Sequence, residues 1–294
     1  MQIFHLLNVS YTSSGYANSF PNASFCIIKF YFILFFYKSK ENSCIVEIFV
    51  VVYVYILYGF QNYIQQYLNF NLEGVEMIIK KKLKDPGSAI THFIGFLMVL
   101  FAGIPLNIKA IQQSDYTCII SVFIYVLGLL LLYAASTLYH SLDISEKVNR
   151  RLKKFDHMMI SILIAGTYTP ICLLSLERKV GIILLSIVWI LAIFEIVFNA
   201  FWIHCPKWVS SIIYIGMGWT CILAFTHIYN SLPLAGFLWL LFGGVIYTVG
   251  GVIYALKLPI FNSQHKNFGS HEIFHLFVMG GSICHFIMIY LYVV

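Results

Sequence analysis

The chain has 294 residues, of which 60% are hydrophobic and only 10% are charged, and its mean hydropathy is +0.85. An average soluble domain has about 25% charged residues, so this composition excludes a soluble globular protein and indicates an integral membrane protein. The net charge of +6 does not indicate a nucleic-acid partner, because the apolar sequence leaves no soluble domain to carry a binding surface.

Residues 1–76 differ in composition from the rest of the chain, because Phe, Tyr, Ile, Asn and Lys, residues of A/T-rich codons, dominate them. One interpretation is an N-terminal extension with one further hydrophobic segment near residues 44–60, which is just long enough to span a bilayer. The other is a start assigned too far upstream, since Leu72-Glu73-Gly74 can be encoded by a ribosome-binding sequence shortly before Met77. We favour the second interpretation, which leaves residues 77–294 as the membrane domain. N-terminal sequencing of the native protein distinguishes the two, and a terminus at residue 1 would contradict our choice.

Apolar stretches of transmembrane length recur from about residue 89 onward, separated by short polar breaks. A spanning helix needs about 20 mostly apolar residues, whereas barrel strands are shorter and alternate in polarity. The runs here are continuous, so the predicted fold is all-α, a polytopic membrane protein with seven transmembrane helices in one bundle. We expect the helices near residues 90–108, 117–139, 157–176, 181–203, 208–227, 234–256 and 271–293.

The lysines and arginines of the membrane domain fall mainly on one side of the predicted bundle. Cytoplasmic loops carry an excess of these residues, so the bias predicts a cytoplasmic N-terminus for the domain and a C-terminus outside. Three of these residues fall on the predicted outer side, namely Lys109, Arg178 and Lys179. Twelve fall on the predicted cytoplasmic side, namely Lys80, Lys81, Lys82, Lys84, Lys147, Arg150, Arg151, Lys153, Lys154, Lys207, Lys257 and Lys266.

Several polar residues lie at the ends of predicted helices that this orientation brings to the cytoplasmic side. His140 ends the second helix, with Ser136 one turn earlier on the same face; Asp156 opens the third; His271 and His275 open the seventh, four residues apart. Ionisable side chains within a membrane are costly and usually functional. Three histidines from two helices with a nearby carboxylate predict a Zn²⁺ site that keeps a position open for water.

The stretch His271-Glu272-Ile273-Phe274-His275 also matches the H-E-x-x-H pattern of zinc metalloproteases. In that interpretation Glu272 would be the general base. A third ligand is not available downstream, because no acidic residue follows His275 and His285 lies about 15 Å further along the helix. We therefore interpret Glu272 as an acid at a helix N-terminus, where the helix dipole favours it, and disfavour an intramembrane metalloprotease.

Four segments resemble the bacterial hemolysin III proteins, which are relatives of the eukaryotic progestin and adiponectin receptors: "DPGSAITHFIGF", "ASTLYHS", "FDHMMISILIAGTYTP" and "SHEIFHLFVMGGSICHF". The resemblance covers about residues 77–294 and does not reach residues 1–76. It implies a seven-helix protein of the bacterial plasma membrane, with a cytoplasmic N-terminus and zinc bound near the inner face.

The resemblance also implies roles for single residues. The motif of the family is H-x-x-x-H, so Glu272 falls on a variable position, which weakens the protease interpretation further. His92, in "ITHFIG", belongs to the family pattern, and we expect a hydrogen-bonding residue beside the site. Carried over by position, Asp156 is the carboxylate at the zinc-bound water, Ser136 is its partner, and the zinc ligands are His140, His271 and His275.

Three classes of function stay open at this point. The wider superfamily includes ceramidases, which implies a zinc-dependent membrane hydrolase acting on a lipid amide or ester, with membrane lipids as its partners. The bacterial branch is named for lysis of red cells, which suggests a pore-forming cytolysin, although no predicted helix carries a polar stripe able to line an aqueous pore. The third class is a structural or sensory membrane protein. Glu195 and Asn199 are the strongly polar pair in mid-span, and we expect a small polar cavity there. The sequence indicates neither the substrate nor the oligomeric state.

Overall fold

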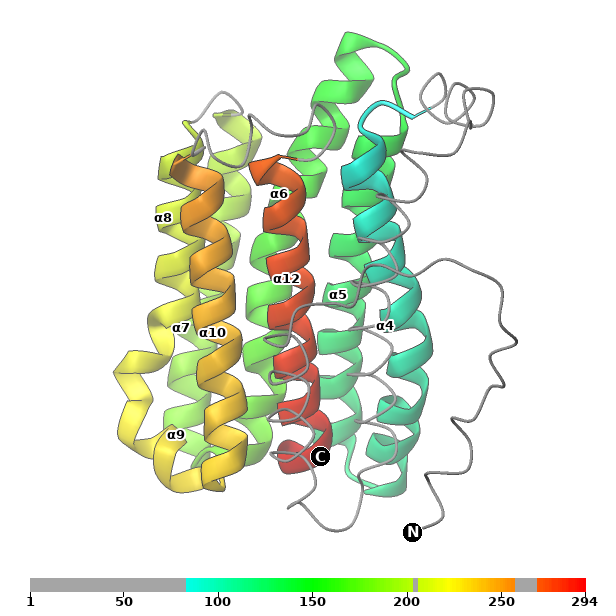
Figure 1. The fold of residues 1–294 in the computed structure, drawn as a ribbon. Coiled ribbons are helices and arrows are strands. Elements are labelled where there is room, and N and C mark those ends of the chain that lie inside the picture. Colours follow the sequence, from blue (N-terminus) through cyan, green and yellow to red (C-terminus); the bar gives the residue numbers. More distant parts are fainter. Residues whose placement is uncertain (1–82, 203–205, 257–268) are drawn as a thin grey trace, which may run out of the picture. The chain divides into compact units, whose positions relative to one another are not determined.

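A computed structural model describes residues 83–202, 206–256 and 269–294. The predicted start at Met77 and the hydrophobic segment near 44–60 lie outside these residues. Within the described part, seven helices are long and apolar enough to cross a membrane, as the sequence predicts. They run side by side in one bundle (Figure 1). The helical segments are α4 (Pro86–Gln112), α5 (Tyr116–Ser141), α6 (Glu146–Pro170) with a π-turn (Ile171–Ser175), α7 (Arg178–Phe201), α8 (Lys207–Gly218), a 3-10 turn (Trp219–Ala224), α9 (Phe225–Ser231), α10 (Leu234–Leu256), and α12 (Ser270–Met288) with a π-turn (Ile289–Val293).

The third helix begins earlier than predicted. The apolar run predicts a start at residue 157, but α6 starts at Glu146. The Ser145 side chain accepts a hydrogen bond from the backbone N–H of Val148 and caps the helix. The charged residues after it therefore form helical turns that precede the apolar part, and hydropathy alone does not detect them.

The fifth span is broken rather than continuous as predicted. α8 ends at Gly218, a 3-10 turn follows, and α9 completes the crossing. Backbone groups freed by such a break must find partners inside the bundle, because lipid offers none. The Tyr168 hydroxyl of α6 supplies them, since it donates to the carbonyl of Gly218 at 2.6 Å and accepts from the N–H of Cys221 at 2.8 Å.

Glycines let α10 and α12 pack closely, as small residues do between helices in membranes. A Cβ atom at Gly243 would lie 2.3 Å from the ring of His285, and one at Gly281 would lie 2.8 Å from the ring of Tyr247. A side chain from each helix thus fills the gap at a glycine of the other. This packing holds α12 against α10 in the bundle (Figure 1).

A polar network ties α6, α7 and α8 together. Glu195 is buried, with 1% of its surface exposed, and it accepts hydrogen bonds from Ser161 and from Asn199, which lies one helical turn after it. Asn199 also donates to the Tyr214 hydroxyl at 3.0 Å, which donates to the carbonyl of His157 at 3.1 Å. These bonds compensate for burying a carboxyl group in the bundle.

Candidate metal centre

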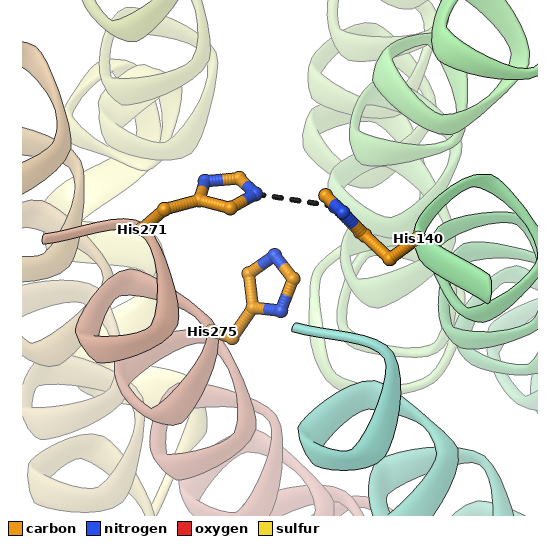
Figure 2. A group of neighbouring side chains, drawn as sticks. All are labelled: His140, His271 and His275. Atoms are coloured by element: carbon orange, nitrogen blue, oxygen red, sulfur yellow. Dashed lines mark hydrogen bonds between the residues drawn. The ribbon is translucent and has the colours of Figure 1, made fainter. Parts of the chain in front are cut away.

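Three histidines that are distant in sequence meet at one end of the bundle. His140 comes from the last turn of α5, and His271 and His275 come from the first two turns of α12. One ring nitrogen of each lies within 4.8 Å of the others, and the three rings face a common space (Figure 2). His140 and His275 are 3% and 2% exposed, and His271 is half-buried.

The spacing of the rings fits a shared metal ion. Nε2 of His271 lies 3.1 Å from Nε2 of His140. Two nitrogens on one tetrahedral zinc, each about 2.0–2.1 Å from the ion, are about 3.3 Å apart. The cluster can therefore hold a metal ion with small movements of the rings. Imidazole suits zinc, copper, iron and nickel alike, so the ligands alone do not fix which metal it is.

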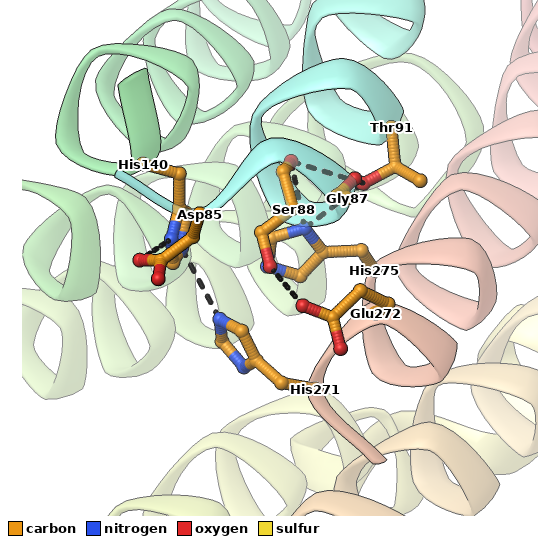
Figure 3. A network of polar contacts seen from close by, with 8 residues as sticks. All are labelled: Asp85, Gly87, Ser88, Thr91, His140, His271, Glu272 and His275. Carbon is orange, nitrogen blue, oxygen red and sulfur yellow. Dashed lines mark hydrogen bonds and ion pairs between the residues drawn. The ribbon is translucent and has the colours of Figure 1, made fainter. Parts of the chain in front are cut away.

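The start of α4 orients two of these rings (Figure 3). Nδ1 of His140 faces the carboxylate of Asp85 at 3.0 Å. Nδ1 of His275 faces the hydroxyl of Thr91 at 3.2 Å and the carbonyl of Ser88 at 3.3 Å. The Thr91 hydroxyl donates to the carbonyls of Gly87 and Ser88, so toward His275 it acts as an acceptor. Acceptors on the Nδ1 side hold the proton there and leave Nε2 free for a metal.

Sequence reasoning missed Asp85. Its backbone N–H donates to the carbonyl of His140 at 2.8 Å, while its half-exposed carboxylate holds the ring of the same residue. The hydrogen bond with His140 is the main reason that the pKa of Asp85 lies below its ordinary value. Asp85 precedes Pro86, the first residue of α4, so the pattern is typical of a helix start and does not indicate a metal site. The signal that was available is its place in the "DPGSAITHFIGF" segment.

Glu272 has a structural role at the start of α12. One carboxylate oxygen accepts from the Ser88 hydroxyl of α4 at 2.6 Å, and the other accepts from the backbone N–H of Gly269 at 2.8 Å (Figure 3). The second bond caps the helix, as predicted for an acid at this position. Both oxygens are therefore engaged away from the histidine cluster, which argues against Glu272 as a general base.

Asp156 and Ser136, the other predicted site residues, lie at the same end of the bundle. Asp156 is 8% exposed and Ser136 is 1% exposed, and the Asp156 carboxyl is within electrostatic range of His140. The Ser136 hydroxyl neighbours Asp156, although its oxygen makes no hydrogen bond of ordinary geometry within the described residues. The structure thus brings all five predicted side chains together.

His92 lies beside the cluster but not in the predicted role. Its ring stacks on that of His275, with centroids 3.6 Å apart and planes 14° apart, and packs edge-on against Tyr133 at 5.1 Å. Within the described residues neither ring nitrogen has a hydrogen-bond partner. The expectation of a hydrogen-bonding residue is therefore wrong, because His92 supports His275 through its ring face. His285 is remote from the cluster and donates to the carbonyl of Leu240 at 3.2 Å.

A cavity of about 390 Å³ extends from the cluster into the bundle. His271, His275, Asp156 and Ser136 line it at one end, and most of its remaining wall is aliphatic and aromatic. The aromatic and aliphatic part of the wall includes Leu132, Ile164, Tyr168, Trp219, Phe225, Ile228, Phe237 and Leu241.

These features define a multi-pass membrane protein with a candidate metal centre at one end of an internal cavity. The model of the haemolysin-III related family matches residues 80–286, and the chain belongs to this family. It is 38% identical to hemolysin-3 of Bacillus cereus over 71% of this chain and 92% of that protein. It is 40% identical to a hemolysin-3 homolog of Bacillus subtilis, over 72% and 95% of the two chains. It is 25% identical to the adiponectin receptor protein of Drosophila melanogaster, over 69% of this chain and 49% of the receptor.

Replacing Asp85 by Asn should weaken zinc binding by about 10- to 100-fold, the usual effect of losing a carboxylate partner of a ligating histidine. The variant keeps the size of the side chain but loses the charge that holds the proton on Nδ1 of His140. Competition with a zinc chelator measures the affinity. Asp143→Asn is the matched control, because Asp143 is exposed and bonds to Asn149. Equal affinities in the two variants would show that Asp85 does not orient the ligand.

Proposed function

We propose that the protein is a zinc-dependent membrane hydrolase that cleaves a lipid amide or ester. The observation that carries this proposal is the placement of the histidine cluster and the Asp156 carboxyl at the end of a largely apolar cavity. A metal that only stabilised the bundle would not need to open onto such a cavity together with an acid. Binding sites for small molecules are typically apolar cavities of this size with a few convergent polar groups.

The histidines, Asp156 and Ser136 have separate roles in the proposed hydrolysis. His140, His271 and His275 would hold the zinc through their Nε2 atoms. A zinc ion in such a site lowers the pKa of its water to about 7 and polarises a carbonyl group. Asp156 accepts the proton released as the water attacks and returns it to the leaving amine or alcohol. Ser136 lies beside Asp156 and would be the hydrogen-bonding partner of its carboxyl.

The shape of the cavity favours a lipid as substrate. Its polar groups gather at the histidine end, whereas aromatic and aliphatic side chains line the part further into the bundle. An acyl chain fits this distribution, with its carbonyl at the cluster and its methylene groups against the apolar wall. An aqueous pore would need polar groups or backbone carbonyls along its length, and this wall does not provide them.

We also propose that the metal centre faces the cytoplasm. The clustered cations of residues 147–154 lie at the start of α6, at the end of the bundle where α5 ends and α12 begins (Figure 1). The bias of lysine and arginine supports this orientation. A C-terminal alkaline phosphatase fusion should be active in a bacterial host and a C-terminal green fluorescent protein fusion dark. The reverse pattern would place the centre outside.

The purified full-length chain should contain about one zinc ion and hydrolyse fatty amides or esters in mixed micelles. The His271→Ala/His275→Ala double variant should lose both the zinc and the activity, since it removes two of the three ligands. Mass spectrometry measures the metal, and release of free fatty acid measures the reaction. His227→Ala is the control, because His227 is an exposed residue of α9. A folded wild type without metal would overturn the hydrolase proposal.

Gly244 of α10 should set the length of chain that the cavity accepts. It lines the cavity, and a Cβ atom there would meet no other atom within 4 Å. It lies ten residues from Tyr254, which packs against His271 with ring centroids 5.4 Å apart, so it is about 15 Å from the level of the cluster along the helix. A larger side chain at Gly244 would therefore obstruct a long acyl chain but not a short one.

Gly244→Leu should lower kcat/KM for a palmitoyl amide by about tenfold or more and leave an octanoyl amide nearly unchanged. Gly216→Leu is the matched control, because Gly216 also has open space around its Cβ position but does not line the cavity. Equal effects of Gly244→Leu on both chain lengths would contradict this placement of the acyl chain.

A further inference from the structure

The end of the cavity beside Asp156 carries polar side chains that the hydrolytic step does not use. They come from α6, α7 and α8 and line the same cavity as the histidine cluster. Tyr214 joins the two groups, since its hydroxyl bonds to the backbone of His157, the neighbour of Asp156. The residues of this polar end are Lys153, Asn199, Ser210, Ser211 and Tyr214.

Ser210 and Ser211 are two adjacent serines that line the cavity. Each residue is 6% exposed, and neither hydroxyl oxygen is among the fully buried, unpartnered side-chain atoms of the described residues. A serine in a helix often bonds back to a carbonyl one turn earlier, as Ser186 does to Ile182, whereas no such bond is found for these two serines within the described part of the chain. Their hydroxyl groups can therefore form hydrogen bonds with a ligand in the cavity.

Asn199 presents an acceptor whose orientation the protein fixes. Its Nδ2 donates to the Glu195 carboxylate and to the Tyr214 hydroxyl. A carboxylate only accepts, so the nitrogen must face Glu195. Both N–H groups are then used, and the carbonyl oxygen Oδ1 is what Asn199 offers to the cavity. Ser161 holds the Glu195 carboxylate from the other side, which keeps this arrangement in place.

The charges at this end argue against an anionic ligand. The Lys153 ammonium is within electrostatic range of the Asp156 carboxyl, so one positive and one negative group line the same region. A phosphate would benefit from Lys153 but would lie beside Asp156 and would have no proton for Oδ1 of Asn199. A hydroxyl group both donates to Oδ1 and accepts from a serine, so it matches the groups at this end of the cavity.

From this arrangement we infer that Ser210, Ser211 and Asn199 form a binding site for an uncharged, hydroxyl-bearing lipid headgroup. The inference rests on the proposed function in one respect, because it places the scissile carbonyl at the histidine cluster next to this site. The polar end then selects the headgroup, and the apolar wall accepts the acyl chain.

Two amides test the inference, N-(2-hydroxyethyl)palmitamide and N-propylpalmitamide, which differ only in a hydroxyl replaced by a methyl group. The wild-type protein in detergent should bind the first about tenfold more tightly, the effect of one or two uncharged hydrogen bonds. Ser210→Ala/Ser211→Ala should lose this preference and bind the N-propyl amide as the wild type does, which also shows that the variant is folded. Binding is read as retention of the intact tritiated amide, so it does not depend on turnover.

Ser121→Ala is the matched control, because Ser121 is fully buried in α5, bonds to the carbonyl of Cys118 and does not line the cavity. It should keep the preference. Retention of the preference by the double variant, or equal binding of both amides by the wild type, would overturn the headgroup site while leaving the hydrolase proposal intact. A wild type that prefers the hydroxyl amide but hydrolyses neither would support the site and overturn the hydrolase. Binding of neither amide would overturn both.

Discussion

The contact between the start of α4 and the histidines of α5 and α12 is the interaction on which the geometry of the candidate metal centre depends. Asp85 and Thr91 each place an acceptor against Nδ1 of one histidine. Without them, the His140 and His275 rings could rotate and either nitrogen could carry the proton. Because both acceptors come from the start of α4 and the residue that caps it, a single segment sets the tautomer of two candidate ligands from two different helices.

The same segment also fixes where the helices start relative to one another. The N–H of Asp85 bonds to the last turn of α5, and the Ser88 hydroxyl bonds to Glu272 at the first turn of α12. These hydrogen bonds hold the ends of three helices at the same depth in the bundle. Apolar contacts alone do not fix this depth, because there is no hydrophobic driving force between helices in lipid. Precise depth matters for a metal site, since ligands must lie within a few tenths of an ångström of their positions.

Hydropathy and histidine spacing predicted most of this architecture, because each rests on a strong constraint on helices in a bilayer. The orientation that the charge bias predicts stays a prediction. The seven spans follow from the cost of exposing backbone to lipid, and the grouping of His140, His271 and His275 follows from the helix period and the order of the spans. The broken fifth span was not predictable in this way, because the Tyr168 hydroxyl that satisfies its freed backbone groups comes from another helix. Asp85 and the stacking of His92 were missed for the same reason, since both act through contacts between residues distant in sequence.

The positions of the polar side chains separate a structural role from a binding role in this bundle. Glu195, although it is a buried carboxyl group, is held by Ser161 and Asn199, which is what a structural role requires. Ser210 and Ser211 instead line the cavity that also contains Asp156. A polar group loses free energy in an apolar environment unless it forms a hydrogen bond. Two serines next to Asn199 at one wall of a largely apolar cavity are therefore better explained by a ligand that bonds to them than by helix packing.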